Sequence, residues 1–191
     1  MSKKRIKYNE SVFYTFDIET TTLITGNRGS HIELNAIVYS GQFYDGSIYT
    51  QVRSIEKCIE QIKRINECSD PEEGVILIFV HFLSYEFQFL KDFFDFTDII
   101  ATQKRKIIRA RWSNLEFRCS FFLSNMNLAK FLESEQVPVE YQKKKMDFSI
   151  RRYPWTKLDP EDQLYMRNDV VGLHKAICNY RDNTCAQKRL K

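Results

Sequence analysis

Residues that mark linkers and disordered segments are scarce in this sequence. Its 191 residues include only 6 Gly and 4 Pro, and we find no low-complexity stretch or internal repeat. With 43% hydrophobic and 14% aromatic residues, the chain can bury one substantial core, and its length fits one domain better than two. We expect a single domain over 1–191, with its core at about 8–183 and flexible basic ends.

Paired cysteines and long apolar runs are also missing. The five cysteines form no CxxC pair and their number is odd, which argues against a zinc site or a disulfide framework and favours a reducing compartment. No apolar run approaches the length of a membrane span, and the charged N-terminus lacks the apolar stretch of a signal peptide. These absences predict a soluble cytoplasmic protein with no membrane partner.

The excess of positive charge is small, but it is clustered. The net charge is +4, which is compatible with nucleic acid without requiring it. Any one basic cluster is more simply explained as a solvated face or tail. The clusters are Lys3-Lys4-Arg5, Lys104-Arg105-Lys106, Lys143-Lys144-Lys145, Arg151-Arg152 and Lys188-Arg189.

Segments rich in β-forming residues alternate with segments of helical periodicity. The predicted strands are 11–19, 31–40, 47–53, 75–80, 106–112 and 115–122, and the predicted helices are 54–67, 85–95, 126–135 and 160–183. The apolar run at 75–80 predicts a strand buried on both faces. Ser84 is a candidate cap for the helix after it, and Asp159 caps the last helix ahead of Pro160. The pattern predicts an α/β or α+β sheet with helices packed on it.

Two acidic residues end the first predicted strand. Asp17 and Glu19 are two positions apart, so their carboxylates leave the same face of the strand. Beside apolar neighbours they repel each other and resist desolvation, so a positive group is expected between them. The alternative is an exposed strand end with two solvated acids.

Two further acids lie beside other buried elements. Glu86 is in the first turn of the helix after 75–80, and Asp169 is in the last helix, one turn after Tyr165. Each is ordinary by itself. Carboxylates that converge from three segments would suit hard cations such as Mg²⁺ or Mn²⁺, and two such ions can activate a water and hold a scissile phosphate. Tyr165 would then orient the attacking water.

Three stretches together carry a family resemblance over roughly residues 8–180. FYTFDIETTT, VHFLSYEFQFL and YMRNDVVGL resemble, in order and spacing, the three exonuclease motifs of family B DNA polymerases, and most closely those of the protein-primed polymerases of phages and linear plasmids. The resemblance implies an RNase H-like α/β fold, with a mixed β-sheet flanked by α-helices, of the DEDD superfamily and its tyrosine subtype. It also implies a proofreading-type 3′→5′ exonuclease that hydrolyses single-stranded DNA with two Mg²⁺ or Mn²⁺ ions.

The resemblance assigns a role to individual residues. It makes Asp17, Glu19, Glu86 and Asp169 the metal ligands and catalytic acids, and Tyr165 the water-orienting tyrosine. Lys143 fits the family's lysine motif and would neutralise charge on the phosphate, although the triplet leaves open which lysine acts. The positions that match contacts to the 3′ end of single-stranded DNA are Thr20, His81, Phe82, Tyr85, Asn127, Leu128 and Phe148.

Two positions depart from the family pattern. Glu86 stands where the family usually has Asp, and Phe82 stands where it usually has Asn, a polar contact to the DNA terminus. Phe82 cannot make that hydrogen bond and is expected to stack on a base or to lower efficiency. Tyr85 and Phe148 can stack on bases in a sequence-tolerant way, or they can be core packing. His174 does not fit any motif, and we expect a surface or packing role for it.

Other readings stay open. One alternative is a catalytically weakened single-stranded DNA-binding module of the same fold, and another is a 3′→5′ exoribonuclease. The chain contains no polymerase half, so it is an isolated exonuclease domain or a stand-alone relative. Its expected partners are the 3′ end of single-stranded DNA and a polymerase domain or replication proteins. The resemblance places it inside a host cell, encoded by a phage or plasmid.

Overall fold

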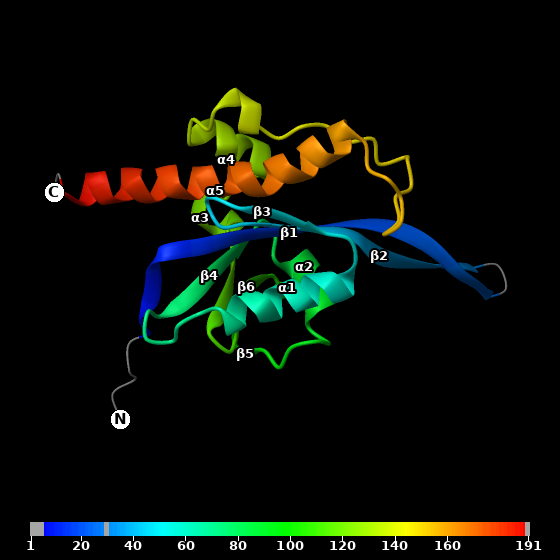
Figure 1. Cartoon of the computed structure of the whole chain (residues 1–191), viewed down its shortest axis with the longest axis horizontal. Coiled ribbons are helices and arrows are strands. Elements are labelled where there is room, and N and C mark those ends of the chain that lie inside the picture. Colours follow the sequence, from blue (N-terminus) through cyan, green and yellow to red (C-terminus); the bar gives the residue numbers. More distant parts are fainter. Residues whose placement is uncertain (1–5, 29–30, 190–191) are drawn as a thin grey trace.

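Seven strands form one mixed sheet in the computed structural model, which describes residues 6–28 and 31–189 (Figure 1). The strands are β1 (Tyr8–Arg28), β2 (His31–Tyr44), β3 (Tyr49–Val52), β4 (Val75–Val80), β5 (Thr97–Ala101), β6 (Ile107–Trp112) and β7 (Leu115–Cys119). Their order is β3-β2-β1-β4-β7-β6-β5, with β4 parallel to both of its neighbours and the other pairs antiparallel. This arrangement confirms the predicted α/β fold with a mixed sheet.

Helices cover both faces of the sheet (Figure 1). They are α1 (Ile55–Glu67), α2 (Ser84–Leu90), α3 (Phe121–Ser124), α4 (Leu128–Ser134), the short 3₁₀ helix η1 (Val139–Tyr141) and α5 (Pro160–Arg189). The alternation of side chains along β4 explains the layers. Ile76, Ile78 and Val80 join the core under α1 and α2, whereas Leu77 and Phe79 join the core under α4 and α5. The predicted strand buried on both faces is confirmed.

A long hairpin extends beyond the rest of the sheet. β1 and β2 are paired from Thr15–Tyr44 out to Arg28–His31, and in Figure 1 their far ends project past the helices. The sequence prediction ended β1 at residue 19 and thus missed this arm. Next to Glu19 the register shifts, because β2 has one extra residue, Tyr39, between the partners of Glu19 and Thr20. Such a bulge bends the strand and re-aims side chains beside it.

Several predicted elements differ from the structure in detail. Strand β5 was not predicted; all of its residues are exposed, so it lacks an apolar pattern. The second helix ends at Leu90 rather than at residue 95. Ser84 is not its N-cap, because the Ser84 hydroxyl instead accepts a hydrogen bond from the Ile107 backbone N–H at 2.8 Å. The helix predicted at 126–135 is α4, and Asn127 caps it.

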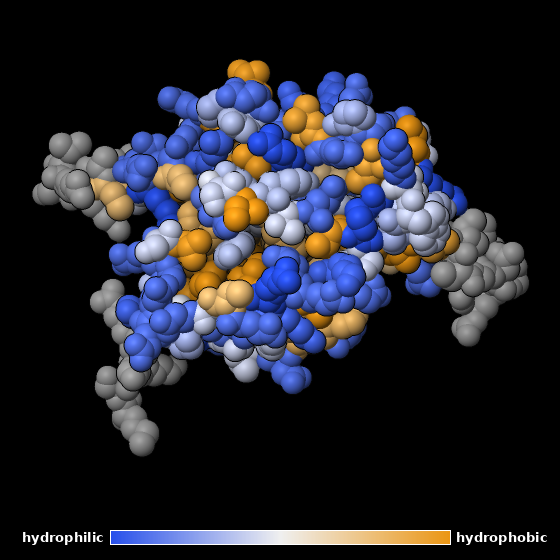
Figure 2. All heavy atoms as spheres, viewed as in Figure 1, coloured by the Kyte–Doolittle hydropathy of each residue, from blue (hydrophilic) through white to orange (hydrophobic). Residues whose placement is uncertain are grey.

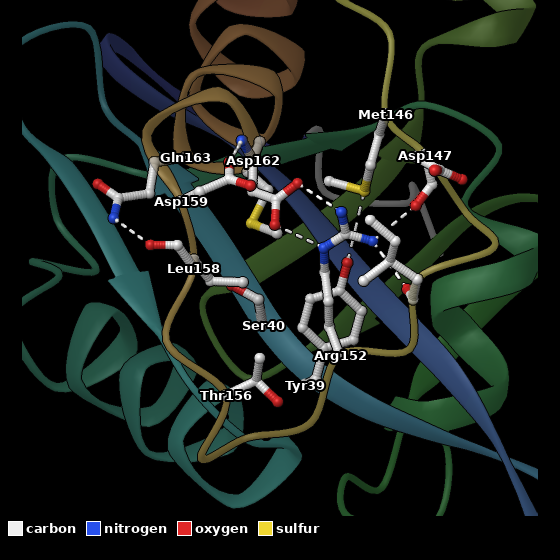
Figure 3. A network of polar contacts seen from close by, with 12 residues as sticks. Tyr39, Ser40, Met146, Asp147, Arg152, Thr156, Leu158, Asp159, Asp162 and Gln163 are labelled. Atoms are coloured by element: carbon white, nitrogen blue, oxygen red, sulfur yellow. Dashed lines mark hydrogen bonds and ion pairs between the residues drawn. The ribbon is translucent and has the colours of Figure 1, made fainter.

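The segment 142–159 crosses the α5 face as an ordered loop held by a buried ion pair (Figure 3). The Arg152 guanidinium donates to both Asp162 carboxylate oxygens, at 2.5 and 2.7 Å, and to the carbonyls of Asp147 and Ile150. Arg152 is therefore a structural residue, and the prediction of a solvated face at Arg151-Arg152 is wrong for it. The Asp159 carboxylate accepts from the Asp162 N–H at 2.7 Å, as a cap of α5 does.

His174 is buried against the sheet. Its ring stacks on Phe13 with centroids 4.0 Å apart, and burial lowers its pKa to about 4. The packing role expected for this residue is confirmed.

Hydrophilic side chains dominate the molecular face shown in Figure 2, with apolar groups interspersed among them. Among the described residues, none of the helices has the length and apolar character needed to cross a membrane. The prediction of flexible basic ends concerns mainly residues 1–5 and 190–191, which lie outside the described residues.

Candidate functional site

A cleft of about 530 Å³ opens where β1, α2, α4 and α5 meet. The segments that form it are far apart in the chain, and the cleft gathers most of the residues singled out from the sequence. Its lining residues are Asp17, Ile18, Glu19, His81, Phe82, Tyr85, Glu86, Asn127, Leu128, Ala129, Lys143, Tyr165 and Asp169.

The carboxylates meet at the floor of the cleft. One oxygen each of Asp17, Glu19 and Asp169 lies within 4.8 Å of the others. Glu86 reaches the same place from the start of α2, where its carboxyl group is hydrogen-bonded to Asp17. The strand geometry expected for Asp17 and Glu19 thus holds, and the bland alternative of two solvated acids is wrong, since Glu19 is only 8% exposed.

Burial of several carboxyl groups together raises their pKa values. Burial and, secondarily, repulsion from Asp169 raise the pKa of Asp17 to about 7, and burial with repulsion from Asp17 raises that of Glu19 to about 9. Burial is also the main cause of the raised pKa of Glu86 and of Asp169. The Lys143 ammonium, which donates to Asp169 at 2.6 Å, opposes part of this effect. The cluster therefore has an excess of negative charge when ionised.

The donor atoms suit divalent cations. Two buried carboxylate oxygens, Glu86 Oε2 and Asp169 Oδ1, have no hydrogen-bond partner among the described residues. Buried charged oxygens without partners are costly, and a bound cation would relieve that cost. An all-oxygen set of carboxylates is what Mg²⁺ and Mn²⁺ prefer. The residues present fit the predicted metal ions.

Tyr165 lies beside the acids, one turn of α5 before Asp169. Lys143 Nζ donates to the Tyr165 hydroxyl at 3.1 Å and lies 4.7 Å from the centre of its ring. Burial raises the pKa of Tyr165, so its hydroxyl keeps its proton at neutral pH. Of the lysine triplet, Lys143 is the member that lines the cleft.

Aromatic side chains form one wall of the cleft. Phe82 and Tyr85 are 44% and 47% exposed, which leaves their ring faces open to a ligand and argues against plain core packing for Tyr85. Phe82 has a left-handed backbone with φ of 65°, unusual for a bulky residue, and its ring is stacked on Phe121 with centroids 4.8 Å apart. Sequence reasoning missed Phe121, because nothing in its own segment marks it as a support for Phe82.

The remaining predicted contacts are placed unequally. His81 lies behind Phe82, where Nδ1 is 3.0 Å from the Ser120 hydroxyl and burial lowers the pKa of the ring to about 4. The Asn127 side-chain oxygen accepts from the Lys130 N–H as the cap of α4, so only its amide nitrogen remains for a ligand, and Leu128 is largely buried.

Thr20 and Phe148 lie just outside the lining. The Thr20 hydroxyl is hydrogen-bonded to the Tyr85 hydroxyl, which ties the arm of β1 to α2. Phe148 is 70% exposed, and its ring centroid lies 6.1 Å from that of Tyr165. All the predicted residues therefore lie in or next to one cleft.

No protein-family model and no curated protein matches the chain. Solved structures of Phi29 DNA polymerase are similar to it. The polymerase complexed with single-stranded DNA superposes with a TM-score of 0.69 at 14% identity, covering 90% of this chain and 32% of the polymerase. The orthorhombic crystal form gives a TM-score of 0.66 at 15% identity, covering 87% of this chain and 30% of the polymerase. The chain thus spans about a third of the length of these polymerases, and the likeness shows a shared fold.

Proposed function

We propose that the chain is a metal-dependent 3′→5′ exonuclease that acts on single-stranded DNA. The observation that carries the proposal is the meeting of Asp17, Glu19, Glu86 and Asp169 with Tyr165 and Lys143 in one open cleft. The likeness to Phi29 DNA polymerase, a protein-primed family B polymerase, supports it through the fold and through the DNA-bound state of that structure.

The four acids would hold two Mg²⁺ or Mn²⁺ ions, which supply an activated water and stabilise charge on the scissile phosphate and the leaving 3′-oxygen. The protein residues do the positioning. The Tyr165 hydroxyl, held by Lys143, would orient the attacking water, and the Lys143 ammonium would neutralise charge that develops on the phosphate. Because Lys143 bonds both Tyr165 and Asp169, one cation fixes the catalytic tyrosine relative to a metal ligand.

The DNA end would lie against the aromatic wall. Phe82 and Tyr85 present open ring faces, and stacking on such faces tolerates any base, as a proofreading site requires. Glu86 reaches the acid cluster from α2, so its extra methylene relative to Asp is accommodated in the fold. We expect it to alter the preference between Mg²⁺ and Mn²⁺ rather than abolish binding.

The test is digestion of a 5′-labelled single-stranded oligonucleotide with Mg²⁺, with Mn²⁺ and with a chelator. The expected result is a ladder shortened from the 3′ end, release of 5′-mononucleotides and no digestion with the chelator. An RNA strand of the same sequence, tested in parallel, distinguishes the exoribonuclease. A protein that binds DNA but leaves it intact with both metals is the weakened binding module, the outcome that Phe82 at the second motif favours.

A further inference from the structure

The loop between η1 and α5 exposes an aromatic stack outside the cleft. Trp155 is 77% exposed, and its ring lies parallel to that of Tyr153, with centroids 5.2 Å apart and an angle of 5° between the planes. A tryptophan with its ring open to water has unused apolar area. The stack is therefore a surface on which a further flat ring can be placed.

Hydrogen bonds hold this stack in place. The Arg53 guanidinium donates to the carbonyls of Tyr153 and Thr156, at 2.9 and 2.8 Å, and the Tyr153 N–H donates to the Thr156 hydroxyl at 2.9 Å. The buried Arg152–Asp162 pair anchors the same loop to α5 (Figure 3). A platform ordered in advance loses little entropy when a ligand binds.

The same loop carries positive charge that is free to meet an anion. Its cationic residues besides Lys143 and Arg152 are Lys144, Lys145, Arg151 and Lys157. None of these four forms an ion pair with a described residue. The acid within the loop, Asp147, accepts hydrogen bonds from Ser149. Exposed cations beside exposed aromatic rings are the combination that binds single-stranded nucleic acid.

A groove of about 370 Å³ joins this surface to the cleft. It is lined by Thr20, Thr21, Thr22, Tyr39, Phe148, Ser149, Ile150, Arg151 and Arg152. At one end Thr20 is bonded to Tyr85 of the cleft wall. At the other, Arg53 donates to the carbonyl of Tyr39, which lines the groove, and to that of Tyr153, which belongs to the stack.

We propose that this second surface, from the groove to the Tyr153–Trp155 stack, binds the part of a single DNA strand that lies 5′ of the end held in the cleft. Arg151 contacts a backbone phosphate, the threonine and serine hydroxyls line the path, and a base stacks on Trp155. The strand direction rests on the proposed exonuclease function, whereas binding to the second surface does not.

The first test measures affinity against strand length. Fluorescence anisotropy compares oligo-dT of about 12 nucleotides, which spans both surfaces, with oligo-dT of about 4, which fills the cleft alone. The Asp17→Ala/Glu19→Ala chain is used with Mg²⁺ so that no strand is cut. Trp155→Ala is expected to lower the ratio of long-strand to short-strand affinity about tenfold, since stacking of one base has that order of effect. Phe93→Ala, at a 48% exposed position that lines neither the cleft nor the groove, is the matched control.

The second test uses fluorescence directly. The chain has two tryptophans, so Trp112→Phe leaves Trp155 as the reporter. The long strand is expected to quench its emission and the short strand is not. Arg151→Ala is expected to reduce by roughly one the slope of log affinity against log salt for the long strand, and Lys63→Ala on α1 leaves it unchanged.

An unchanged affinity ratio in Trp155→Ala, or no quenching by the long strand, overturns the proposal. Because these are binding measurements, they stand even if the chain does not cut DNA. A chain that cuts DNA but shows no length-dependent loss keeps the exonuclease function and loses the second surface.

Discussion

Two sets of buried carboxylates are treated in opposite ways in this protein. Glu116, fully buried on β7, accepts from Arg118 and from the Tyr8 hydroxyl, and Asp162 on α5 is held by both arms of the Arg152 guanidinium. The four acids of the cleft share one bonded lysine, and two of their buried oxygens have no partner among the described residues. The first set is neutralised by side chains, and the second leaves its negative charge for an external cation.

The contrast shows why burial alone does not identify a metal site. A buried acid paired with arginine is a structural element that is costly to break. A buried acid cluster short of cations raises its own pKa values and loses stability when it ionises. The difference between the sets is their charge balance, and each prediction below tests one side of it.

The largest effect is expected from removing the acids of β1. Asp17→Ala with Glu19→Ala should lower the rate of strand digestion by about 10³-fold or more, because the metal ions lose two of their ligands. The same change should leave the metal-free protein as stable as the parent or more stable, since mutual repulsion is removed. Digestion assays and thermal melts in a chelator check both parts. Parental digestion by this variant would show that the site is misassigned.

Breaking the neutralised pair should have the opposite consequence. Arg152→Ala leaves Asp162 buried without its partner and should lower the free energy of unfolding by about 3–5 kcal/mol. In a chain of this size that corresponds to a fall in Tm of roughly 10 °C. Arg152→Met with Asp162→Leu should recover much of the loss. Calorimetry measures both variants, and equal melting of the single variant and the parent would mean that the pair is not structural.

The pH dependence of the metal-free protein should reveal the unbalanced cluster. The folded-state pKa values of Asp17 and Glu19, about 7 and about 9, lie above their ordinary values of 3.8 and 4.5. The fold therefore favours the protonated forms, and their contribution is present at low pH and is lost as the pH rises from about 5 to about 9. We expect a loss of about 2 kcal/mol in a chelator over this range. Mn²⁺ should raise the Tm more at the high end, and a flat profile without metal would contradict the assignment.

The smallest effect is expected at the tyrosine. Tyr165→Phe removes the hydroxyl that Lys143 holds but none of the carboxylates, so digestion should slow by about 10- to 100-fold while metal binding persists. Isothermal titration with Mn²⁺ separates the two properties. A loss of Mn²⁺ affinity equal to the loss of rate would mean that the hydroxyl supports the metal site instead of the water.

The sequence was informative where a local pattern carried the structure. The apolar run at 75–80 predicted a strand buried on both faces, and Asp159 with Pro160 predicted the start of α5, because caps and burial are written in neighbouring residues. The spacing of Asp17 and Glu19 predicted a shared face for the same reason. That Glu86 and Asp169 join them was inferred by combining motifs, and it depends on pairings across the whole sheet.

What was missed depends on contacts between distant segments. Arg152 resembles any solvated arginine in the sequence, and its burial follows only from the closure of its loop onto Asp162. The role of Ser84 was misjudged because its hydroxyl is used by Ile107 of another strand. Strand β5 is exposed throughout, so pairing with β6 and not an apolar pattern defines it. Propensity does not record such partners.

The bulge at Tyr39 has a consequence for the whole β1–β2 arm. It adds one residue to β2, and the second register shift adds one to β1, between Ile24 and Gly26. The two insertions cancel, so the outer ladder returns to the alignment of the inner ladder. A single deletion in either strand between them would turn one face of the arm inside out. The arm can thus change length only when both strands change together, and Tyr39, whose carbonyl Arg53 binds, marks the point from which that length is counted.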